Sequence, residues 1–483
     1  MAITFRQTTD SRGTNKGSAL TGSEYDNTLI SILNGKFLSA LDYGATGDGV
    51  TDDTTALQSA LTSLSGGGCL YLPAGSYIVS DVLRVPAEVS IIGDGKEASS
   101  SIKMADGANL DVVLAHSNWY SNNAFSQRGS LWFNFSINGN RDNQASGSGH
   151  GIIATPFYHH IADVTVTNTR GNGIYFPDTT RNGTTITGTG VENKVINCRI
   201  RGCDLSGIRV DDNGAWTDGM ILNNDISDCG VFGIGAIRAA GWRICGNRTY
   251  QTSKTAIRAD KASWTQISGN LIDSYGGSAD VGTYCAIELN SYLGFSGAQG
   301  TIISDNVIFN DTNNGSNSYD GIKVITGTGN SNSHVSITGN IIRGNGTERA
   351  IRLQGDNSEL EVIVADNLIK NVGSYLSKSG DVTVYGKNTP ATVTSIADGD
   401  ATPSVLSTSL FSTSNTSPTT ITNFNDGFIG QEITLIIGDS NTTIDFSGSN
   451  LKGNGGIDWS PSSDDFMTCT FNGTNWYCNI TES

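Results

Sequence analysis

The segment Ala256-Ile257-Arg258-Ala259 decides the fold, because its pattern returns along the chain. The pattern is a small residue, Ile, a variable and usually charged residue, and a small or apolar residue. It occurs seven times, in Gly173-Ile174-Tyr175-Phe176, Gly207-Ile208-Arg209-Val210, Ala236-Ile237-Arg238-Ala239, Ala256-Ile257-Arg258-Ala259, Ala286-Ile287-Glu288-Leu289, Gly321-Ile322-Lys323-Val324 and Ala350-Ile351-Arg352-Leu353. The Ile residues are 20 to 35 positions apart. A repeat that keeps its core pattern while the connections change length is typical of a solenoid.

Side chains alternate between the two faces of a strand, so each Ile is expected to point inward and the next residue outward. A second series of residues ends short apolar strands: Asn197, Asn224, Asn247, Asn270, Asn306, Asn340 and Asn367. Asn tolerates a left-handed backbone and hydrogen bonds to its neighbours. These Asn residues therefore predict a stacked structural column at a corner of the coil.

Composition favours short strands joined by tight turns, since 60 of 483 residues are Gly and only 16% are charged. A net charge of −17 argues against a nucleic-acid partner, which needs clustered Lys and Arg. No stretch approaches the roughly 18 apolar residues of a membrane span, and residues 1–35 lack the apolar core of a secretory signal. We expect a protein made in a cytoplasm and not inserted into a membrane.

The eight Cys residues do not form a disulfide framework in a chain of this length. Most fall in or beside apolar strands, where a thiol acts as a small hydrophobic group. Their spacing matches no zinc pattern, so no metal and no cofactor is predicted. Cys469 and Cys478 flank the turn Asn472-Gly473 and are the only plausible bridge, although assembly in a cytoplasm predicts that they are reduced.

Residues 37–77 resemble the opening of the pectate-lyase-like family of right-handed parallel β-helices. The resemblance is carried by Phe37 to Ala45, by Gly47-Asp48-Gly49-Val50-Thr51-Asp52-Asp53, by Gly66-Gly67-Gly68 and by Tyr71 to Tyr77. It implies a fold and not a reaction, because such folds host many activities. Asp52 or Asp53 is expected to cap a helix from Thr54 to Leu64. The cluster with Asp48 is interpreted as a capped turn and not as a calcium site.

The leader Lys16-Gly17-Ser18-Ala19-Leu20-Thr21-Gly22-Ser23-Glu24-Tyr25-Asp26-Asn27 is similar to the start of many bacteriophage tail fibre and tailspike proteins. That resemblance implies a homotrimer in the virion tail, made in the host cytoplasm. It also implies that residues 1–36 attach the spike to a phage tail or adaptor protein.

After residue 388 the pattern changes. Residues 389–418 are rich in Ser and Thr, and short strands then alternate with turns up to Cys478. We therefore predict three regions: a virion-attachment leader (1–36), a β-helix with an N-terminal capping helix (37–388), and a linker with a small C-terminal antiparallel β domain (389–483). The last region is expected to cap the open end of the solenoid and to support trimerisation, with sugar binding as the alternative.

The outward positions of the repeated strands form a predicted charged column. Its members are Tyr175, Arg209, Arg238, Arg258, Glu288, Lys323 and Arg352, with Asp211 and Asp260 at the next outward position. Stacked like charges about 4.8 Å apart repel one another. Three interpretations remain open: a ladder of structural ion pairs, a groove for an anionic polysaccharide, or a contact between subunits.

As an enzyme site, the column offers paired carboxyl groups for glycoside hydrolysis. Glu288, between two cations, is the predicted base or nucleophile, and Asp260 or Asp211 is the predicted acid. Asp211 and Asp260 are expected about 9–10 Å apart, near the wide limit for an inverting pair, while Asp260 and Glu288 are diagonal neighbours. The cationic residues, Tyr175 and Trp216 are the predicted polysaccharide contacts, Trp216 because aromatic rings stack on sugars.

Two other functions fit the same residues. A polysaccharide lyase acting on uronic acids needs a group that neutralises the carboxylate and a base. Both can be supplied by Tyr175, Arg209, Arg258 and Lys323. His159 and His160 add imidazoles near the N-terminal coils. The second alternative is a spike that binds its host polysaccharide, whether capsule, exopolysaccharide or lipopolysaccharide, without cutting it.

Overall fold

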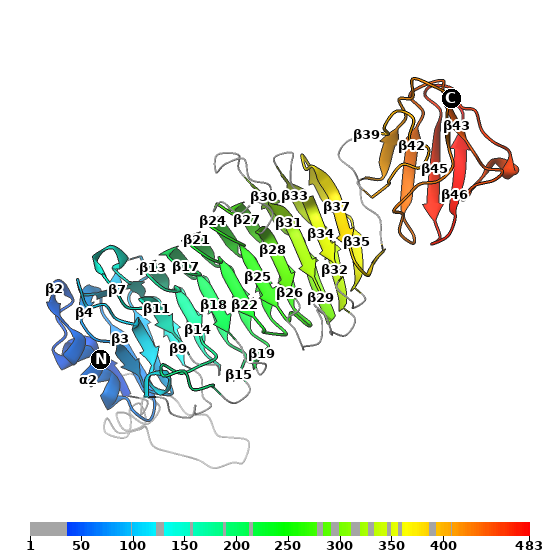
Figure 1. The fold of residues 1–483 in the computed structure, drawn as a ribbon. Helices are drawn as coiled ribbons and strands as arrows, with labels where there is room; N and C mark the ends of the chain where they lie inside the picture. Colours follow the sequence, from blue (N-terminus) through cyan, green and yellow to red (C-terminus); the bar gives the residue numbers. More distant parts are fainter. Residues whose placement is uncertain are drawn as a thin grey trace, which may run out of the picture.

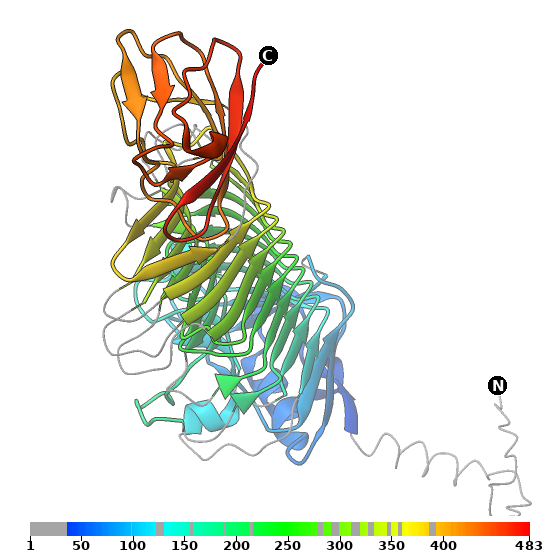
Figure 2. The ribbon, with the colours of Figure 1, turned by 90° about the vertical axis from the view of Figure 1, so that its right-hand side faces the viewer.

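The structure, a computed structural model, describes residues 36–97, 99–121, 130–154, 158–186, 190–211, 216–277, 284–290, 299–310, 319–326, 333–344, 349–355, 360–385, 393–406 and 408–483. The described chain forms an elongated solenoid with a separate β-rich unit at its C-terminal end (Figure 1). Turning the molecule by 90° shows the coils stacked along one axis (Figure 2).

Three parallel sheets form the walls of the solenoid, and each coil contributes one strand to each sheet. Sheet A comprises β1 (Lys36–Ser39), β3 (Gly68–Leu72), β6 (Val89–Gly93), β9 (Leu131–Phe133), β12 (His160–Ala162), β16 (Lys194–Ile196), β20 (Met220–Leu222), β23 (Arg243–Cys245), β26 (Gln266–Ser268), β29 (Gln299–Ser304), β32 (Ser333–Thr338), β35 (Leu360–Ala365) and β38 (Val382–Tyr385). Sheet B comprises β2 (Asp48–Asp52), β4 (Gly75–Val79), β7 (Ser100–Met104), β10 (Ser136–Asn138), β13 (Thr165–Thr169), β17 (Arg199–Cys203), β21 (Asp225–Cys229), β24 (Arg248–Thr252), β27 (Leu271–Tyr275), β30 (Val307–Phe309), β33 (Ile341–Arg343) and β36 (Leu368–Lys370). Sheet C comprises β5 (Leu83–Val85), β8 (Val112–His116), β11 (His150–Ile153), β14 (Ile174–Phe176), β18 (Ile208–Asp211), β22 (Ile234–Ile237), β25 (Ile257–Asp260), β28 (Cys285–Asn290), β31 (Asp320–Ile325), β34 (Arg349–Gln354) and β37 (Ser374–Ser379).

The inward Ile residues of sheet C pair in register from coil to coil. Ile174, Ile208, Ile234, Ile257, Ile287, Ile322 and Ile351 form one column. All seven side chains are fully buried. The predicted parallel β-helix is therefore confirmed, and it accounts for most of the chain.

One of the seven predicted strands was placed three residues too late. In β22 it is Ile234 that pairs with Ile208, so Gly235 occupies the outward position opposite Arg209. Ile237 pairs with Asp211, and Arg238 follows the strand with φ +62°. The error arose because Gly233-Ile234-Gly235-Ala236 and Ala236-Ile237-Arg238-Ala239 both fit the pattern of a small residue followed by Ile. Arg238 therefore lies outside the charged column.

The predicted Asn column is present at the corner between sheets A and B. Asn224, Asn247, Asn270, Asn306, Asn340 and Asn367 are buried, and each of the first five donates from its side-chain amide to the Oδ1 of the next at 2.9–3.0 Å. Asn197 is not a member, because Cys198 holds the equivalent position.

The expected left-handed backbone belongs to the residue before each column member. Asn197, Asn223, Gly246, Gly269, Asp305, Gly339 and Asp366 have φ between +55° and +68°. The column Asn residues themselves bond through their amides and backbone N–H groups.

The N-terminal coils are covered by helix α2 (Thr54–Ser63) together with the 3-10 helix η1 (Ala40–Tyr43). The N-cap residue is Asp53, but its carboxylate accepts from Thr46 and Gly47 and makes no cap hydrogen bond to the helix, while Asp52, one residue earlier, accepts from Thr54. Asp48 accepts from the backbone of Val50 and Thr51. Each carboxylate thus holds a turn, as predicted. Shorter elements elsewhere in the solenoid are α3 (Ser117–Ser121), η2 (Arg141–Asn143), β15 (Gly190–Val191) and β19 (Trp216–Thr217).

The C-terminal unit contains a second hydrophobic core and a six-stranded sheet. The strands of that sheet are β39 (Thr394–Ser395), β40 (Leu410–Ser412), β42 (Glu432–Ile436), β45 (Phe466–Phe471), β46 (Trp476–Thr481) and β44 (Leu451–Lys452), and a small sheet pairs β41 (Thr419–Ile421) with β43 (Thr442–Ile444). A 3-10 helix, η4, spans Asn454–Gly456. The predicted antiparallel pairing is found for β42, β45 and β46, while the flanking strands pair in parallel.

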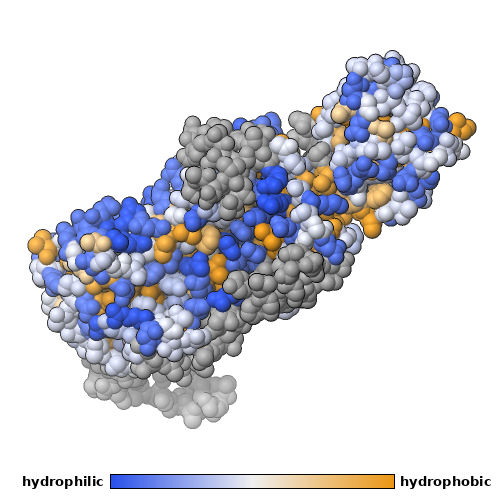
Figure 3. All heavy atoms as spheres, viewed as in Figure 1, coloured by the Kyte–Doolittle hydropathy of each residue, from blue (hydrophilic) through white to orange (hydrophobic). Residues whose placement is uncertain are grey.

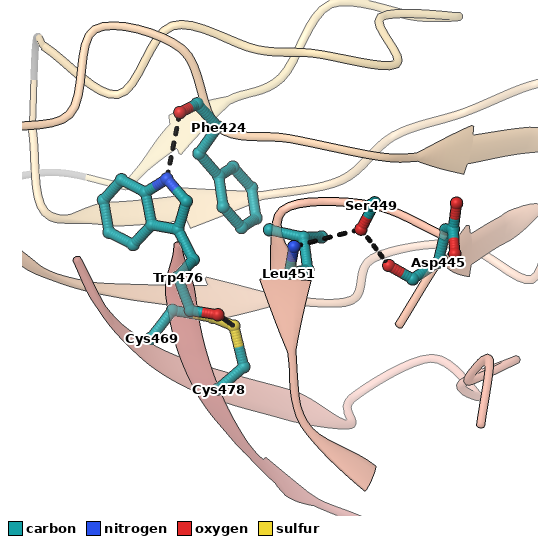
Figure 4. The surroundings of a disulfide bond; sticks show 7 residues. All are labelled: Phe424, Asp445, Ser449, Leu451, Cys469, Trp476 and Cys478. Atoms are coloured by element: carbon teal, nitrogen blue, oxygen red, sulfur yellow. Dashed lines mark hydrogen bonds between the residues drawn. A yellow bond between two sulfur atoms is a disulfide. The ribbon is translucent and has the colours of Figure 1, made fainter. Parts of the chain in front are cut away.

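Cys469 and Cys478 are joined by a disulfide bond in this unit (Figure 4). The prediction that the two thiols are reduced is wrong in the structure. The antiparallel register of β45 and β46 places the two residues directly opposite each other, with their Cα atoms 4.0 Å apart. Trp476 packs beside the bridge and donates from its indole N–H to the Phe424 carbonyl oxygen at 3.0 Å.

Candidate functional site

The outward residues of sheet C form a charged column along the solenoid. Strand pairing places Tyr175, Arg209, Gly235, Arg258, Glu288, Lys323 and Arg352 opposite one another in successive coils. Sequence analysis placed six of these seven residues in the column, and only Gly235 was missed. The column is therefore present, and Gly235, its one uncharged aliphatic position, separates two clusters of charged residues.

Arg209 and Arg258 do not stack directly on each other. Gly235 lies between them in register, and the ring of Phe232 takes the place of its missing side chain. The Arg209 and Arg258 guanidinium carbons lie 5.5 and 5.6 Å from the centre of that ring. Two cation–π contacts and the extra spacing reduce the repulsion that the sequence predicted.

The first cluster is built around Asp211 in β18. The Tyr175 hydroxyl donates to one carboxylate oxygen at 2.9 Å, and Arg209 Nε donates to the other at 2.6 Å. Burial and the neighbouring Asp211 carboxylate raise the pKa of Tyr175 well above its usual range. The His150 ring lies 5.1 Å from the Tyr175 ring, and burial lowers the His150 pKa to about 4. A phenol and a guanidinium thus hold Asp211, and a neutral imidazole, which accepts from the Asn172 backbone N–H at 2.9 Å, lies beside the phenol ring.

The second cluster is built around Asp260 and Glu288. Both oxygens of Asp260 are held by Arg258, at 2.9 and 3.1 Å, and the residue is only 2% exposed. Burial raises the pKa of Asp260, and the Arg258 fork offsets part of that effect. This carboxyl group is therefore easier to protonate than an ordinary surface aspartate.

Glu288 is 5% exposed and has longer ionic contacts. Its Oε1 atom lies 3.9 Å from both Arg258 Nη1 and Lys323 Nζ, and its Oε2 atom accepts from the Thr255 hydroxyl at 3.3 Å. Both faces of β28 and β31 are shielded from solvent at these residues. Charge interactions are stronger in such surroundings than in water.

Sequence analysis missed Asp320 and Arg349, which extend this cluster. Asp320 is almost fully buried and accepts from Arg349 at 2.6 and 3.2 Å, with Arg352 Nη1 at 3.7 Å. Both lie two positions before the repeated Ile, on the parity that strict alternation assigns to the inward face. Alternation therefore did not mark them, and only the contacts between coils show their pairing.

The remaining predicted residues lie outside both clusters. Arg238 donates to Asp178 at 2.9 Å. Trp216 begins β19, but its side chain lies outside the described part of the molecule. His159 is buried beside His116 and Trp132, at ring distances of 5.8 and 4.8 Å, and does not belong to the column. Burial lowers the His116 pKa to about 4, and burial together with His116 lowers the His159 pKa to about 3.

A cavity of about 610 Å³ lies away from the column, at the ends of the sheet B strands. Arg141, Asp204, Asp228 and Gln251 contribute to its wall, and Arg141 pairs with Asp204 at 3.0 Å. Within the described ranges, no three His, Cys, Asp or Glu side chains gather as metal ligands would. None of the helices described there has the length and apolar character needed to cross a membrane. Hydrophilic residues dominate the face seen in Figure 3, with hydrophobic ones scattered among them.

Comparisons with known proteins match this architecture. Over 115 residues the chain is 38% identical to mannuronan C5-epimerase AlgE2 of Azotobacter vinelandii, a match that covers 21% of this chain and 11% of the epimerase. Over 87 residues it is 40% identical to the tail spike protein of Shigella phage Sf6, covering 17% of this chain and 14% of that protein. The chain thus spans only a small part of the length of these relatives.

Solved structures show the same fold. The A-module of A. vinelandii mannuronan C-5 epimerase AlgE4 superposes with a TM-score of 0.52 at 20% identity, covering 73% of this chain and all of that module. The N-terminal fragment of bacteriophage phi29 gene product 12 superposes with a TM-score of 0.51 at 17% identity, covering 93% and 76%. The family model for rhamnogalacturonase A/epimerase, pectate lyase-like proteins matches residues 37–284, which is more than half of the chain. The chain belongs to this pectate lyase-like family.

Proposed function

We propose that this protein is a phage tailspike that binds and depolymerises a host surface polysaccharide by glycoside hydrolysis at the second cluster. The observation that carries the proposal is the pair Asp260 and Glu288, two buried carboxyl groups on adjoining coils of the column. The similarity to the Sf6 tail spike protein supports the tailspike identity.

Glu288 is assigned as the base and Asp260 as the acid. Glu288 has no bidentate partner among the contacts described above, so a water molecule or a sugar carbon would compete only with its long contacts to Arg258, Lys323, Thr255 and Cys285. Burial favours the protonated form of Asp260, as a general acid requires. Diagonal neighbours on parallel strands about 4.8 Å apart have Cα atoms roughly 8 Å apart. We assign the inverting reaction, in which a water molecule lies between two carboxyl groups roughly 6.5–9.5 Å apart.

The cations of the column give the site its selectivity. Arg209, Arg258, Lys323 and Arg352 lie on one face of a strongly acidic chain, and each is within ion-pair distance of a carboxylate with which a ligand would compete. Guanidinium groups match carboxylates in a two-pronged geometry. We therefore assign an acidic polysaccharide as the substrate.

The test compares two Glu→Gln variants. Glu288→Gln is expected to lower the release of reducing ends from the host polysaccharide by roughly 10²- to 10⁴-fold. Glu361→Gln, on sheet A and paired with His334, is the matched control and should retain activity. Equal activity of Glu288→Gln and wild type would refute the assignment.

A lyase is the second candidate, and the first cluster favours it. Tyr175 and Arg209 meet at Asp211, with the neutral His150 beside the Tyr175 ring. A lyase would use the guanidinium for the uronate carboxylate and the phenol or the imidazole for proton transfer. A lyase creates an unsaturated uronate that absorbs ultraviolet light, whereas a hydrolase does not. Loss of that absorbance in Tyr175→Phe, with Glu288→Gln still active, would decide for the lyase.

We also propose that the protein is a homotrimer attached to the phage tail or an adaptor protein through residues 1–36, of which residues 1–35 lie outside the described part of the chain. An apolar column on sheet B supports self-association. Leu271, Val307, Ile341 and Leu368 pair in register and point outward, and three of them are more than a third exposed. Aligned exposed aliphatic side chains are typical of a protein interface. Ile341→Lys should therefore lower the mass measured by light scattering from trimer towards monomer.

A further inference from the structure

A second column of residues marks the corner where sheet C passes into sheet A. Its members lie two positions before the first paired residue of successive sheet A strands and all have a left-handed backbone, with φ between +53° and +70°: Tyr158, Glu192, Asp218, Gly241, Trp264 and Gly300. Gly, Asn and Asp adopt this conformation readily, whereas bulky side chains do so at a cost. Tyr158 and Trp264 are therefore exceptions.

Trp264 is also exceptional in its exposure. Its side chain is 71% exposed, whereas Trp119, Trp132, Trp242, Trp459 and Trp476 are all buried. Tyr158, at the same corner, is 47% exposed. Strained backbone and exposed aromatic rings thus coincide at two places in one column. Neither ring contributes to the core, so folding alone does not explain them.

Backbone hydrogen bonds to the next coil hold the Trp264 corner. The Trp264 backbone N–H donates to the Gln299 carbonyl oxygen of the next coil at 2.7 Å, and Lys261 N–H donates to Asn290 at 3.0 Å. A Cβ atom at Gly300 would lie 3.2 Å from Trp264 Cδ1, so the ring rests close to the glycine backbone. Because Gly300 has no side chain, the indole has room on that side.

The two aromatic residues are well placed for a long ligand. Four coils separate them, which is about 19 Å along the solenoid axis at the usual strand spacing. Trp264 follows Asp260 by four residues, so its Cα atom lies within about 14 Å of that carboxyl-bearing residue. A chain that crosses the charged column can therefore reach the corner.

We propose that Trp264 and Tyr158 are stacking platforms for sugar rings, forming binding subsites of a polysaccharide outside the charged clusters. Sugar rings carry apolar C–H faces that pack on aromatic surfaces. The inference rests on the proposed polysaccharide function and adds residues that contact the polymer without taking part in bond cleavage. The competing role for this corner is a contact with a second protein chain. An apolar cavity of about 360 Å³, lined by Gly300 together with Ile302, Ile363 and Tyr385, is the kind of surface that such a contact would cover.

Trp264→Gly separates the two roles, because glycine accepts the left-handed backbone as Gly241 and Gly300 do. The variant is expected to melt at the same temperature as wild type or higher, and to bind acidic polysaccharide roughly 2- to 10-fold more weakly. Trp264→Phe should recover part of the affinity. Tyr477→Ala, an exposed aromatic residue of the C-terminal unit, is the matched control and should bind normally.

Fluorescence gives an independent readout. The part of the acrylamide quenching that Trp264→Phe removes reports on Trp264, and in the wild-type protein alginate or polygalacturonate should protect that part while neutral dextran should not. Unchanged polysaccharide binding by Trp264→Gly with normal cleavage would overturn the subsites and leave the proposed function standing. Dissociation of the oligomer by the same substitution would assign the corner to a protein contact and also overturn them. If wild type neither binds nor cleaves any acidic polysaccharide in a panel that includes host surface polysaccharide, the proposed function fails, and the subsites fail with it.

Discussion

The solenoid carries two columns of polar side chains that obey different rules. The Asn column repeats one residue in six successive coils, and its amides satisfy one another in the interior. The charged column changes residue at almost every coil and leaves Glu288 with only long ionic contacts. The repetition of Asn indicates a structural role, in which the column joins successive coils. The variation of residue type in the charged column indicates a surface that contacts a ligand.

The largest expected effect on stability comes from the buried end of the charged column. Asp320→Asn leaves Arg349 and Arg352 without their carboxylate and should lower the free energy of unfolding by about 3 kcal/mol. Asp225→Asn on sheet B is the control. Asp225 contacts three arginines, one more than Asp320 does, but its side chain is more than a third exposed. Its loss should cost less than about 1 kcal/mol. Equal melting temperatures for the two variants would contradict the distinction.

Breaking the Asn column should be slightly less costly. Asn270→Ala removes the acceptor of the Asn247 backbone N–H and side-chain amide, and the donor to the Ile244 carbonyl oxygen. Unsatisfied buried groups of this kind should lower stability by about 2–3 kcal/mol in chemical denaturation. Asn197→Gly, exposed, outside the column and compatible with the left-handed backbone at this position, should change stability by less than about 0.5 kcal/mol.

Acid should distinguish the N-terminal coils from those that contain the Asn column. The pKa values of His116 and His159 are lowered on folding, to about 4 and about 3. Below pH 6.5, the ordinary pKa of an imidazole, the unfolded chain therefore binds more protons than the folded chain. Their contribution is fully present above pH 6.5 and falls as the pH drops towards 4. At pH 5.5 the loss should be about 1 kcal/mol for each imidazole. Hydrogen exchange should then open β9 and β12 before the coils that contain the Asn column.

The smallest expected effect tests the break in the charged column. A Cβ atom at Gly235 would lie 2.8 Å from the Phe232 ring, so Gly235→Ala should displace that ring and reduce stability by about 1 kcal/mol. Because the ring separates Arg209 from Arg258, the loss should grow at low salt, where the two charges repel more strongly. A loss that does not depend on salt would assign only a packing role to Phe232.

The fold was predictable because the core pattern repeats and strand alternation is strict. Six residues of the charged column followed from this alternation, as did the position of the Asn corner. Arg238 was misplaced because two overlapping segments fit the same template, and only strand pairing chooses between them. Phe232 reaches the column from outside the repeated pattern, so alternation does not reveal its role. The contacts of Asp320 and the exposure of Trp264 depend on neighbouring coils, which sequence spacing does not describe.

The amide column has a consequence for how such a protein changes over time. Each Asn of the column forms its side-chain hydrogen bonds with the neighbouring coils, at the corner between sheets A and B. That corner is remote from the outward residues of sheet C. Substitutions that retune the outer wall therefore leave the spine of the solenoid unaltered. Ligand preference and the stability of the solenoid thus depend on different positions of the same repeat. Selection can change the outward residues of sheet C while it keeps the Asn column.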